Sequence, residues 1–277
     1  MTPARPVLRY HGSKWRLSKW IMSFFPPHKV YVEPFGGGGS VLLRKRPVEQ
    51  EIYNDLDQEI VNVFRVLRDP AQAAELQRLL YYTPHAREEY ELSHQPADTP
   101  LEAARRTITR SFLGHSSNAV TSQYKNGFRG KRAGSAGPAR EWATYPGHID
   151  SFVSRLRTVT LECVPAMTLI AKYDGPATLF YIDPPYLRET RTAHGKSYRH
   201  EMTREEHVEL AGALHALQGM VVLSGYDSGL YQELYSDWHV ARKDTQADGS
   251  VDRTEVLWIS PNAHLANRPG LLEAVAL

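Results

Sequence analysis

The chain contains a single cysteine, Cys163, among its 277 residues. One cysteine cannot form an intrachain disulfide or a multi-cysteine zinc site, so the composition gives no sign of an oxidising compartment. Long apolar runs are also missing. No stretch reaches the roughly 20 residues of a membrane span, and residues 1–9 lack the apolar core of a signal peptide. We therefore expect a cytoplasmic protein that contacts no membrane.

Acidic residues are absent from one long segment. The whole chain is nearly balanced, with 33 Lys+Arg against 31 Asp+Glu. Between residues 105 and 140 there is no Asp or Glu, and the basic residues there are Arg105, Arg106, Arg110, Lys125, Arg129, Lys131, Arg132 and Arg140. Because the rest of the chain is net negative, this basic segment suits a phosphate backbone. A solvated loop without a function is the alternative.

The apolar pattern predicts an α/β fold. Apolar runs at residues 29–33, 51–54, 178–182, 220–224 and 256–259 predict strands, and the amphipathic stretches among them predict crossover helices. One helix start is clear, because Thr203 and Glu206 have the spacing of a capping box ahead of the apolar Leu210 and Leu214.

Strand patterns become scarce after residue 56, where residues 56–67, 71–80 and 101–112 have helical periodicity. We therefore expect a catalytic domain of residues 1–57 and 150–277, interrupted by an inserted domain of residues 58–149. The end of this insertion, residues 114–147, is rich in Gly, Ser, Asn and Arg. That composition is typical of a mobile loop or the tip of a hairpin.

The most informative motif is Asp183-Pro184-Pro185-Tyr186, which directly follows the apolar run ending at Ile182. Ligands bind at this carboxyl edge in open α/β sheets. An aromatic amine is a poor nucleophile, because its lone pair is delocalised into the ring. The Asp183 carboxylate and the Pro184 carbonyl can each accept one amino hydrogen and so aim the lone pair at a methyl sulfonium.

The other two residues of the motif support the same chemistry. The consecutive prolines stiffen the turn, and Tyr186 offers a flat face on which an extruded base can stack. A strand that is simply ended by Pro184 and Pro185, with Asp183 and Tyr186 solvated, is the alternative.

A second motif, Glu33-Pro34-Phe35, is followed by the glycines 36–39 and by Ser40. Glycines let the backbone approach a ligand closely. The spacing does not fit G-x-G-x-x-G, because Val41 or Leu42 stands at the position of the third glycine, and no Lys-Ser/Thr follows as in a P-loop. Dinucleotide and nucleoside triphosphate ligands are therefore disfavoured, and a plain glycine-rich turn is the alternative.

Two further segments indicate an adenosyl ligand. Asp55 ends the next predicted strand, where a carboxylate can accept both ribose hydroxyls. It can equally cap a helix, with Gln58 three residues further on. The segment from Tyr10 to Lys14 (Y-H-G-S-K) provides an aromatic ring to cover the ligand and a cation to neutralise its carboxylate, or else forms a solvated turn.

In this order, the motifs resemble those of the Dam-type DNA adenine methyltransferases, including phage-borne members. That family has an N-terminal aromatic-x-Gly-x-Lys motif, an E-P-F-x-G-x-G cofactor loop, a target-recognition insertion and then D-P-P-Y. The resemblance covers about residues 7–261 and is poorest at residues 83–147, where residues 118–132 are the candidate for the family's β-hairpin. It implies a Rossmann-like, S-adenosylmethionine-dependent methyltransferase sheet with an inserted, mainly helical target-recognition domain.

The resemblance also implies the roles of individual residues. S-adenosylmethionine would be bound by Tyr10, Lys14, Glu33, Pro34, Phe35, Gly36, Gly38, Ser40, Asp55 and Asp183. The flipped adenine would be held by Asp183, Pro184, Pro185 and Tyr186. In the insertion, we expect Lys125, Arg129, Lys131 and Arg132 to bind phosphates of double-stranded DNA, and Asn118 or Arg110 to read a base edge. A monomer in a bacterial or phage-infected cell is expected, with a cognate restriction enzyme as an open question.

Other functions remain open from the sequence. The same chemistry can act on cytosine N4 or on a glutamine amide, although similar enzymes often carry Ser or Asn in place of Asp183. A catalytically silent DNA-binding relative is a further alternative, against which the intact motif residues argue. His194, His200 and His207 lack the spacing of metal ligands, so we expect them in loops or on the surface and expect no metal.

Overall fold

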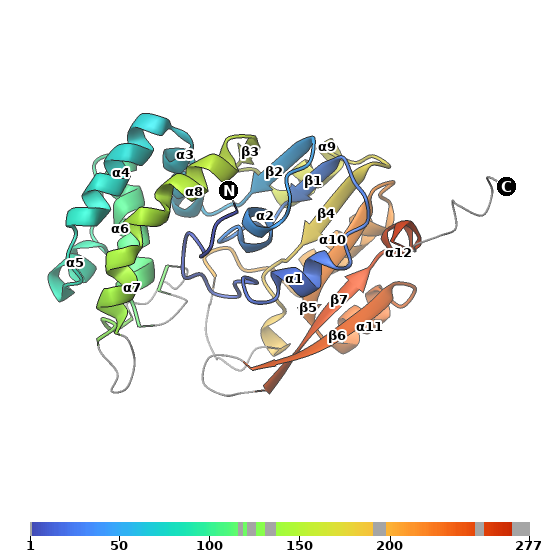
Figure 1. The fold of residues 1–277 in the computed structure, drawn as a ribbon. Helices are drawn as coiled ribbons and strands as arrows, with labels where there is room; N and C mark the ends of the chain where they lie inside the picture. Colours follow the sequence, from blue (N-terminus) through green and yellow to red (C-terminus); the bar gives the residue numbers. More distant parts are fainter. Residues whose placement is uncertain are drawn as a thin grey trace.

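The computed structural model describes residues 2–115, 119–120, 126–130, 137–190, 198–246 and 252–267. A seven-stranded sheet of order β3-β2-β1-β4-β5-β7-β6 forms its centre (Figure 1). The strands are β1 (Val30–Glu33), β2 (Gln50–Asn54), β3 (Val159–Glu162), β4 (Thr178–Ile182), β5 (Met220–Tyr226), β6 (His239–Gln246) and β7 (Asp252–Ile259). β1 to β5 pair in parallel, whereas β7 is antiparallel to both β5 and β6.

Alternate residues of each central strand enter two separate apolar cores. In β4, Leu179 and Tyr181 join one core, while Phe180 and Ile182 join the other. Because side chains alternate across a strand, a continuous apolar run such as β4 is what a sheet covered on both faces requires. The sequence prediction for this strand, residues 178–182, is confirmed at both ends.

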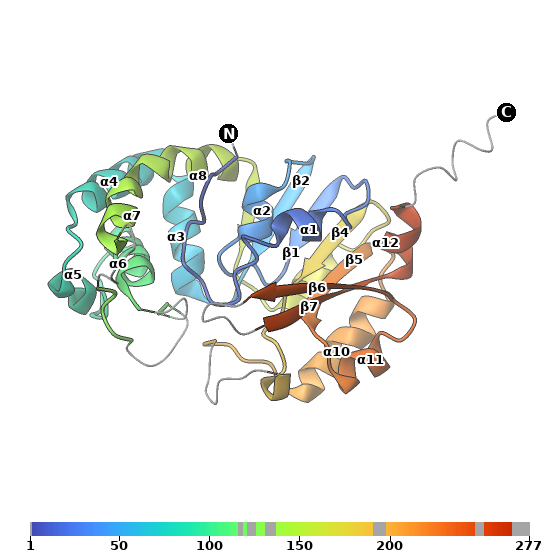
Figure 2. The same cartoon turned by 60° about the horizontal axis from the view of Figure 1, so that its bottom comes forward.

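Helices cover both faces of the sheet. Figure 2 shows α1 (Ser18–Met22) and α2 (Ser40–Arg44) on one side, and α10 (Arg204–His215) and α11 (Gly229–Leu234) on the other. α9 (Ala166–Lys172) packs in the same core as α10 and α11, and α12 (Pro261–Ala266) packs in the core of α1 and α2. The capping box expected at Thr203 is present, with Thr203 and Glu206 exchanging hydrogen bonds at the start of α10.

The segment between β2 and β3 forms a group of helices to one side of the sheet (Figure 1). It comprises α3 (Gln58–Arg68), α4 (Pro70–Tyr82), α5 (Arg87–Leu92), α6 (Pro100–Leu113), α7 (Pro138–Thr144), the 3₁₀ turn η1 (Pro146–His148) and α8 (Ile149–Leu156). Their apolar side chains belong to the same core as Tyr31 and Tyr53 of the sheet. The insertion therefore packs directly on the catalytic sheet, and its proposed limits at residues 58 and 149 remain a prediction.

The structure corrects the expectation for residues 114–147. Instead of a loop throughout, α7 begins at Pro138, where proline is favoured because the first helical N–H needs no partner. Of the expected hairpin at residues 118–132, most lies outside the described residues. Within the described part of this range, Phe128 forms an antiparallel bridge with Gly114, which precedes the expected hairpin. In the described part of the chain, no helix has the length and apolar character needed to cross a bilayer.

Candidate active site

The two main motifs meet at one edge of the sheet. β1 and β4 are parallel neighbours, with Val32 opposite Phe180. The chain order reverses between these two strands, and in open α/β sheets the crevice outside such a reversal is where ligands bind. The loops that follow β1 and β4, which carry the glycines and the D-P-P-Y motif, therefore face each other across one site.

A cavity that is open to solvent lies between these loops. All the residues expected to bind the cofactor line it, namely Tyr10, Lys14, Glu33, Pro34, Phe35, Gly36, Gly38, Ser40, Asp55 and Asp183. Of the expected adenine-binding residues, Asp183 and Pro185 line it as well. The structure thus brings together motifs that are far apart in the sequence.

The glycine loop is held between two tyrosine rings. A Cβ atom on Gly36 would lie 2.2 Å from a ring carbon of Tyr53, and one on Gly37, whose φ is +47°, would lie 2.6 Å from a ring carbon of Tyr10. The Tyr53 hydroxyl donates a hydrogen bond to the Gly37 carbonyl at 2.6 Å. Side chains at these positions would displace the rings that hold this backbone, so the turn requires glycine here. Tyr53 was not expected in this role.

Asp55 supports the glycine loop from the end of β2. Its Oδ2 accepts a hydrogen bond from Gly37 N at 2.8 Å, and its Oδ1 accepts one from Asp57 N at 2.8 Å. The N-cap of α3 is Asp57, which accepts from Glu59 N at 3.0 Å. The interpretation of Asp55 as a helix cap is therefore wrong. Burial raises the pKa of Asp55 to about 6.

The N-terminal segment is fixed against the same site. Ser13 Oγ lies 2.8 Å from Ser40 Oγ at the start of α2. Lys14 is buried, and its Nζ donates to the Gly12 carbonyl at 3.0 Å and lies 3.2 Å from Asp183 Oδ1. Burial alone would lower the pKa of Lys14, but Asp183 and Glu255 more than offset this, so its pKa is raised. The alternative of a solvated turn is wrong for Lys14.

Tyr186 is buried, with only 7% of its surface exposed. Its hydroxyl is 2.9 Å from Ser224 Oγ and donates to Glu255 Oε2 at 3.3 Å. Lys14 Nζ is 4.7 Å from the centre of the Tyr186 ring. The alternative of a solvated Tyr186 is therefore wrong. Because the ring is covered, a base can stack on it only if some of these contacts open.

The carboxyl group of Glu33 is also buried in the cavity wall. Its Oε2 accepts hydrogen bonds from Tyr31 Oη and from Leu42 N, each at 3.1 Å. Burial raises the pKa of Glu33 to about 8, although the Tyr31 hydrogen bond acts in the opposite direction. Through these two hydrogen bonds, Glu33 ties β1 to the start of the helix that follows the glycine loop.

Residues 198–202 form a wall of the cavity that the sequence did not indicate. Arg199 fixes this wall to the start of α3: its guanidinium donates to Asp57 Oδ1 at 3.2 Å and to Glu59 Oε2 at 2.7 Å. Burial alone would raise the pKa of Glu59, but Arg199 and Arg110 lower it. Asn54 is a further unexpected residue, because its side chain joins the Pro34 carbonyl to Val164.

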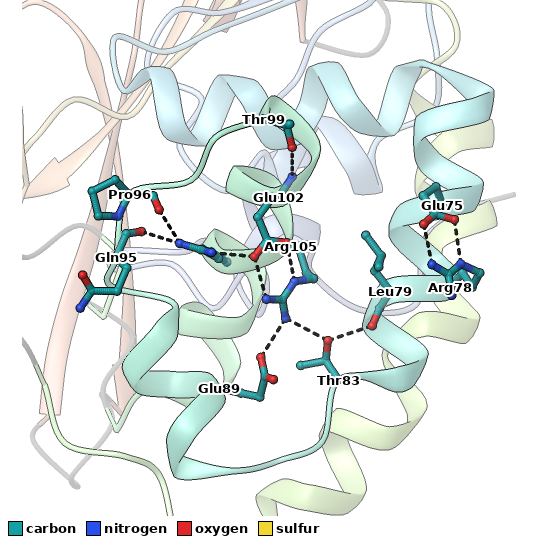
Figure 3. A network of polar contacts seen from close by, with 11 residues as sticks. Glu75, Arg78, Leu79, Thr83, Glu89, Gln95, Pro96, Thr99, Glu102 and Arg105 are labelled. Carbon is teal, nitrogen blue, oxygen red and sulfur yellow. Dashed lines mark hydrogen bonds and ion pairs between the residues drawn. The ribbon is translucent and has the colours of Figure 1, made fainter.

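Acidic residues outside the basic segment pair with four of its eight basic residues. Arg105 binds Glu102 and Glu89, and it also donates to Thr83 Oγ1 at 3.0 Å (Figure 3). Arg106 pairs with the same Glu102 at 2.6 Å. Glu102 precedes Arg105 and Arg106 in α6, and Glu89 belongs to α5, so both carboxylates lie outside residues 105–140.

The residues expected to contact DNA differ in their surroundings. Arg110 is buried, pairs with Glu59 at 2.5 Å and donates to the Ser93 carbonyl at 2.9 Å, so its placement favours a role in packing over base reading. Arg129 pairs with Glu141 at 2.7 Å. Asn118, Lys125, Lys131 and Arg132 lie outside the described residues.

One of the three histidines is not where the sequence predicted it. His207, expected in a loop or on the surface, is buried in α10, with Nδ1 2.9 Å from the Tyr231 hydroxyl. His200 is exposed at the cavity, and His194 lies outside the described residues. Within the described ranges, no three His, Cys, Asp or Glu side chains gather as metal ligands.

Comparison with known proteins agrees with this geometry. The family model of the D12 class N6 adenine-specific DNA methyltransferases matches residues 10–248. The chain is 26% identical over 254 residues to Type II methyltransferase M1.LlaDCHI of Lactococcus lactis subsp. cremoris, covering 85% of this chain and 86% of that protein.

It is similar as well to proteins named DNA adenine methylase. Identity is 24% over 247 residues with that of Serratia marcescens, covering 86% of this chain and 88% of the relative. With that of Escherichia coli (strain K12) it is 23% over 243 residues, covering 85% of each chain. These matches confirm the expected resemblance and the Rossmann-like methyltransferase fold. The protein belongs to the D12 class of N6 adenine-specific DNA methyltransferases.

Proposed function

We propose that the protein transfers a methyl group from S-adenosylmethionine to the N6 amino group of an adenine extruded from double-stranded DNA. The observation that carries this proposal is the position of Asp183. It lies at the carboxyl end of β4, on a cavity that the glycine loop and Asp55 also line. An acceptor for an amine and a pocket for an adenosyl group therefore adjoin each other.

The residues present fit S-adenosylmethionine, which supplies an electrophilic methyl group on a positively charged sulfur. The glycine loop lines the cavity and, because it lacks Cβ atoms, offers its main-chain groups for close approach. Each carboxylate oxygen has more than one acceptor position, so Asp55 can bind its two backbone N–H groups and still accept ribose hydroxyls. The wall formed by residues 198–202 supports exclusion of water from the same cavity.

The D-P-P-Y residues would orient the amine. Among contacts of the described residues, Asp183 is engaged by Lys14 through Oδ1, which leaves Oδ2 to accept an amino hydrogen. The Pro184 carbonyl would accept the second one, and Pro185 restricts the turn. Tyr186 would stack on the extruded base after its covering contacts open. A monomeric state and a cognate restriction enzyme remain predictions.

Replacing Asp183 tests this assignment. In Asp183→Ala the acceptor is removed, and we expect saturated turnover on duplex DNA to fall by roughly 10²–10³, as when one oriented hydrogen-bonding group is removed from an active site. Cofactor analogue binding and the melting temperature report whether the pocket persists. Asp237→Ala, at an exposed position paired with His215 beyond the opposite edge of the sheet, is the matched control. Retention of more than about a tenth of turnover in Asp183→Ala would contradict the assigned role.

A further inference from the structure

Glu255 is a buried carboxylate that the D-P-P-Y chemistry does not itself use. It lies on β7, opposite Tyr226 of β5 and Lys243 of β6, and is 8% exposed. Although 69 residues separate it from Tyr186, its Oε2 accepts a hydrogen bond from the Tyr186 hydroxyl at 3.3 Å. A carboxylate is costly to bury without partners, so its burial beside the Tyr186 hydroxyl and the Lys14 ammonium requires an explanation.

Glu255 shares one buried cation with Asp183. Lys14 Nζ lies 3.2 Å from Asp183 Oδ1 and 3.9 Å from Glu255 Oε2. A charge-assisted N–H···O bond is normally about 2.7–2.9 Å long. The Lys14 ammonium, which also donates to the Gly12 carbonyl at 3.0 Å, is therefore shared between that carbonyl and the two carboxylates rather than fully engaged by Asp183. Without the negative charge of Glu255, Lys14 would be drawn toward Asp183 and would compete with the substrate amine for its oxygens.

Glu255 also fixes the orientation of the Tyr186 ring. The phenol hydroxyl is held by Ser224 Oγ at 2.9 Å and by Glu255 Oε2 at 3.3 Å. The ring packs edge-on against Tyr226, with ring centres 4.7 Å apart. With the hydroxyl anchored at one end, rotation of the ring is restricted by contacts from β5 and β7.

We infer that Glu255 is a positioning residue for methyl transfer, which holds Lys14 and Tyr186 so that the Asp183 carboxylate is left to the substrate amine. This inference rests on the proposed role of Asp183. It assigns Glu255 no contact with the base or the cofactor. Its loss should therefore slow the transfer step more than it weakens the binding of either ligand.

Glu255→Gln separates charge from shape, because it keeps the size and one acceptor oxygen. We expect kcat to fall about 10- to 100-fold, the change that loss of a hydrogen bond to a charged group produces. The dissociation constant of S-adenosylhomocysteine and the KM for DNA should stay within about threefold of wild type, since interactions made equally before and during reaction are retained. Glu162→Gln is the matched control, because Glu162 is also a strand glutamate paired with a lysine, Lys172, but lies at the far edge β3.

A double variant tests whether Glu255 acts through Lys14. If it does, Lys14→Gln/Glu255→Gln should be no slower than Lys14→Gln alone, because the competing cation has been removed. A duplex with 2-aminopurine at the target position should still increase in fluorescence with Glu255→Gln, showing that extrusion of the base persists.

Two outcomes would overturn the inference. Unchanged kcat in Glu255→Gln, with Asp183→Ala inactive, would contradict the role of Glu255 while leaving the proposed function intact. If the melting temperature and the cofactor affinity both fall together with kcat, Glu255 contributes to general stability instead. Activity retained in Asp183→Ala would, by contrast, remove the proposed function on which the inference rests.

Discussion

The Asp55 side chain supports the glycine loop and also lines the cavity. Its two oxygens hold the glycine loop and the Asp57 backbone, and burial raises its pKa to about 6. Ribose hydroxyls donate hydrogen bonds, so they favour the ionised carboxylate. The ionised fraction of Asp55 should therefore control how tightly the adenosyl group binds.

We predict that affinity for S-adenosylhomocysteine decreases as the pH falls through about 6, approaching a tenfold loss per pH unit below that value. The sign follows from the raised pKa of Asp55: above pH 6 the carboxylate is already ionised, and below it a proton must be released before binding. Titration calorimetry between pH 5 and 8 measures this. Asp55→Asn should bind weakly with no step near pH 6, whereas Glu75→Gln, at an exposed surface pair, should titrate like wild type. A step that persists in Asp55→Asn would assign it to another group.

The positions of residues in motifs were predictable, because each motif is a short contiguous stretch of sequence that directly follows a predicted strand. Asp183 and the glycine loop were placed correctly at the cavity from the strands that precede them. Tyr53 and Glu255 were not, because each is a single residue in a strand, and its contact with the site depends on strands that pair across the sheet. Their roles become visible only once the strand order is known.

At the scale of elements, the segment after D-P-P-Y is tied to the start of α3. Arg199 donates to Asp57 and Glu59, and the Asp57 backbone N–H in turn donates to Asp55. Glu59 also binds Arg110 of α6. One carboxylate thus connects the cavity wall at residues 198–202 with the inserted helices.

We predict that Arg199→Ala weakens binding of S-adenosylhomocysteine roughly tenfold, corresponding to the loss of one hydrogen bond to a charged partner. Arg199→Lys should recover only part of this, because an ammonium cannot reproduce the two-pronged contact of a guanidinium. Titration calorimetry gives the affinities. Arg204→Ala is the control, since Arg204 forms an exposed pair with Glu189. Wild-type affinity in Arg199→Ala would show that the wall does not need this anchor.

Strands with a continuous apolar run were predicted from the sequence, whereas β3 and β6, which have few buried apolar residues, were missed. β4 was predicted at both ends, since all five of its residues are buried. β3 was missed because only Val159 of its four residues is buried, so its pattern is weak. β6 was missed because its sequence, HVARKDTQ, is that of a charged edge strand whose structure comes from pairing with β7.

At the scale of the molecule, the insertion and the sheet share one apolar core. The charge of the insertion is also distributed differently from its sequence. Arg105, Arg106, Arg110 and Arg129 are paired with carboxylates, so four of the expected cations are offset within the protein. The sequence of residues 105–140 predicted a basic patch, because the pairing carboxylates of Glu59, Glu89, Glu102 and Glu141 all lie outside those residues.

We therefore predict that DNA binding depends most on Lys125, Lys131 and Arg132, which lie outside the described residues. Replacing all three by Ala should weaken binding to cognate and scrambled duplexes alike and reduce the salt slope by about one for each phosphate that is no longer bound. Arg129→Ala should have a smaller effect, because Glu141 already pairs with it. Fluorescence anisotropy at several salt concentrations measures both quantities, with Lys29→Ala at an exposed pair as the control. An unchanged slope in the triple variant would place the DNA elsewhere.

The identity of the methylated base decides the proposed function most directly. Duplex DNA incubated with the protein and isotopically labelled S-adenosylmethionine, then digested to nucleosides and analysed by mass spectrometry, reveals that base. We expect the label in N6-methyl-2′-deoxyadenosine with the wild-type protein, and at least about 100-fold slower labelling with Asp183→Ala. Label in N4-methyl-2′-deoxycytidine, in protein glutamine or in no product at all would contradict the proposed function.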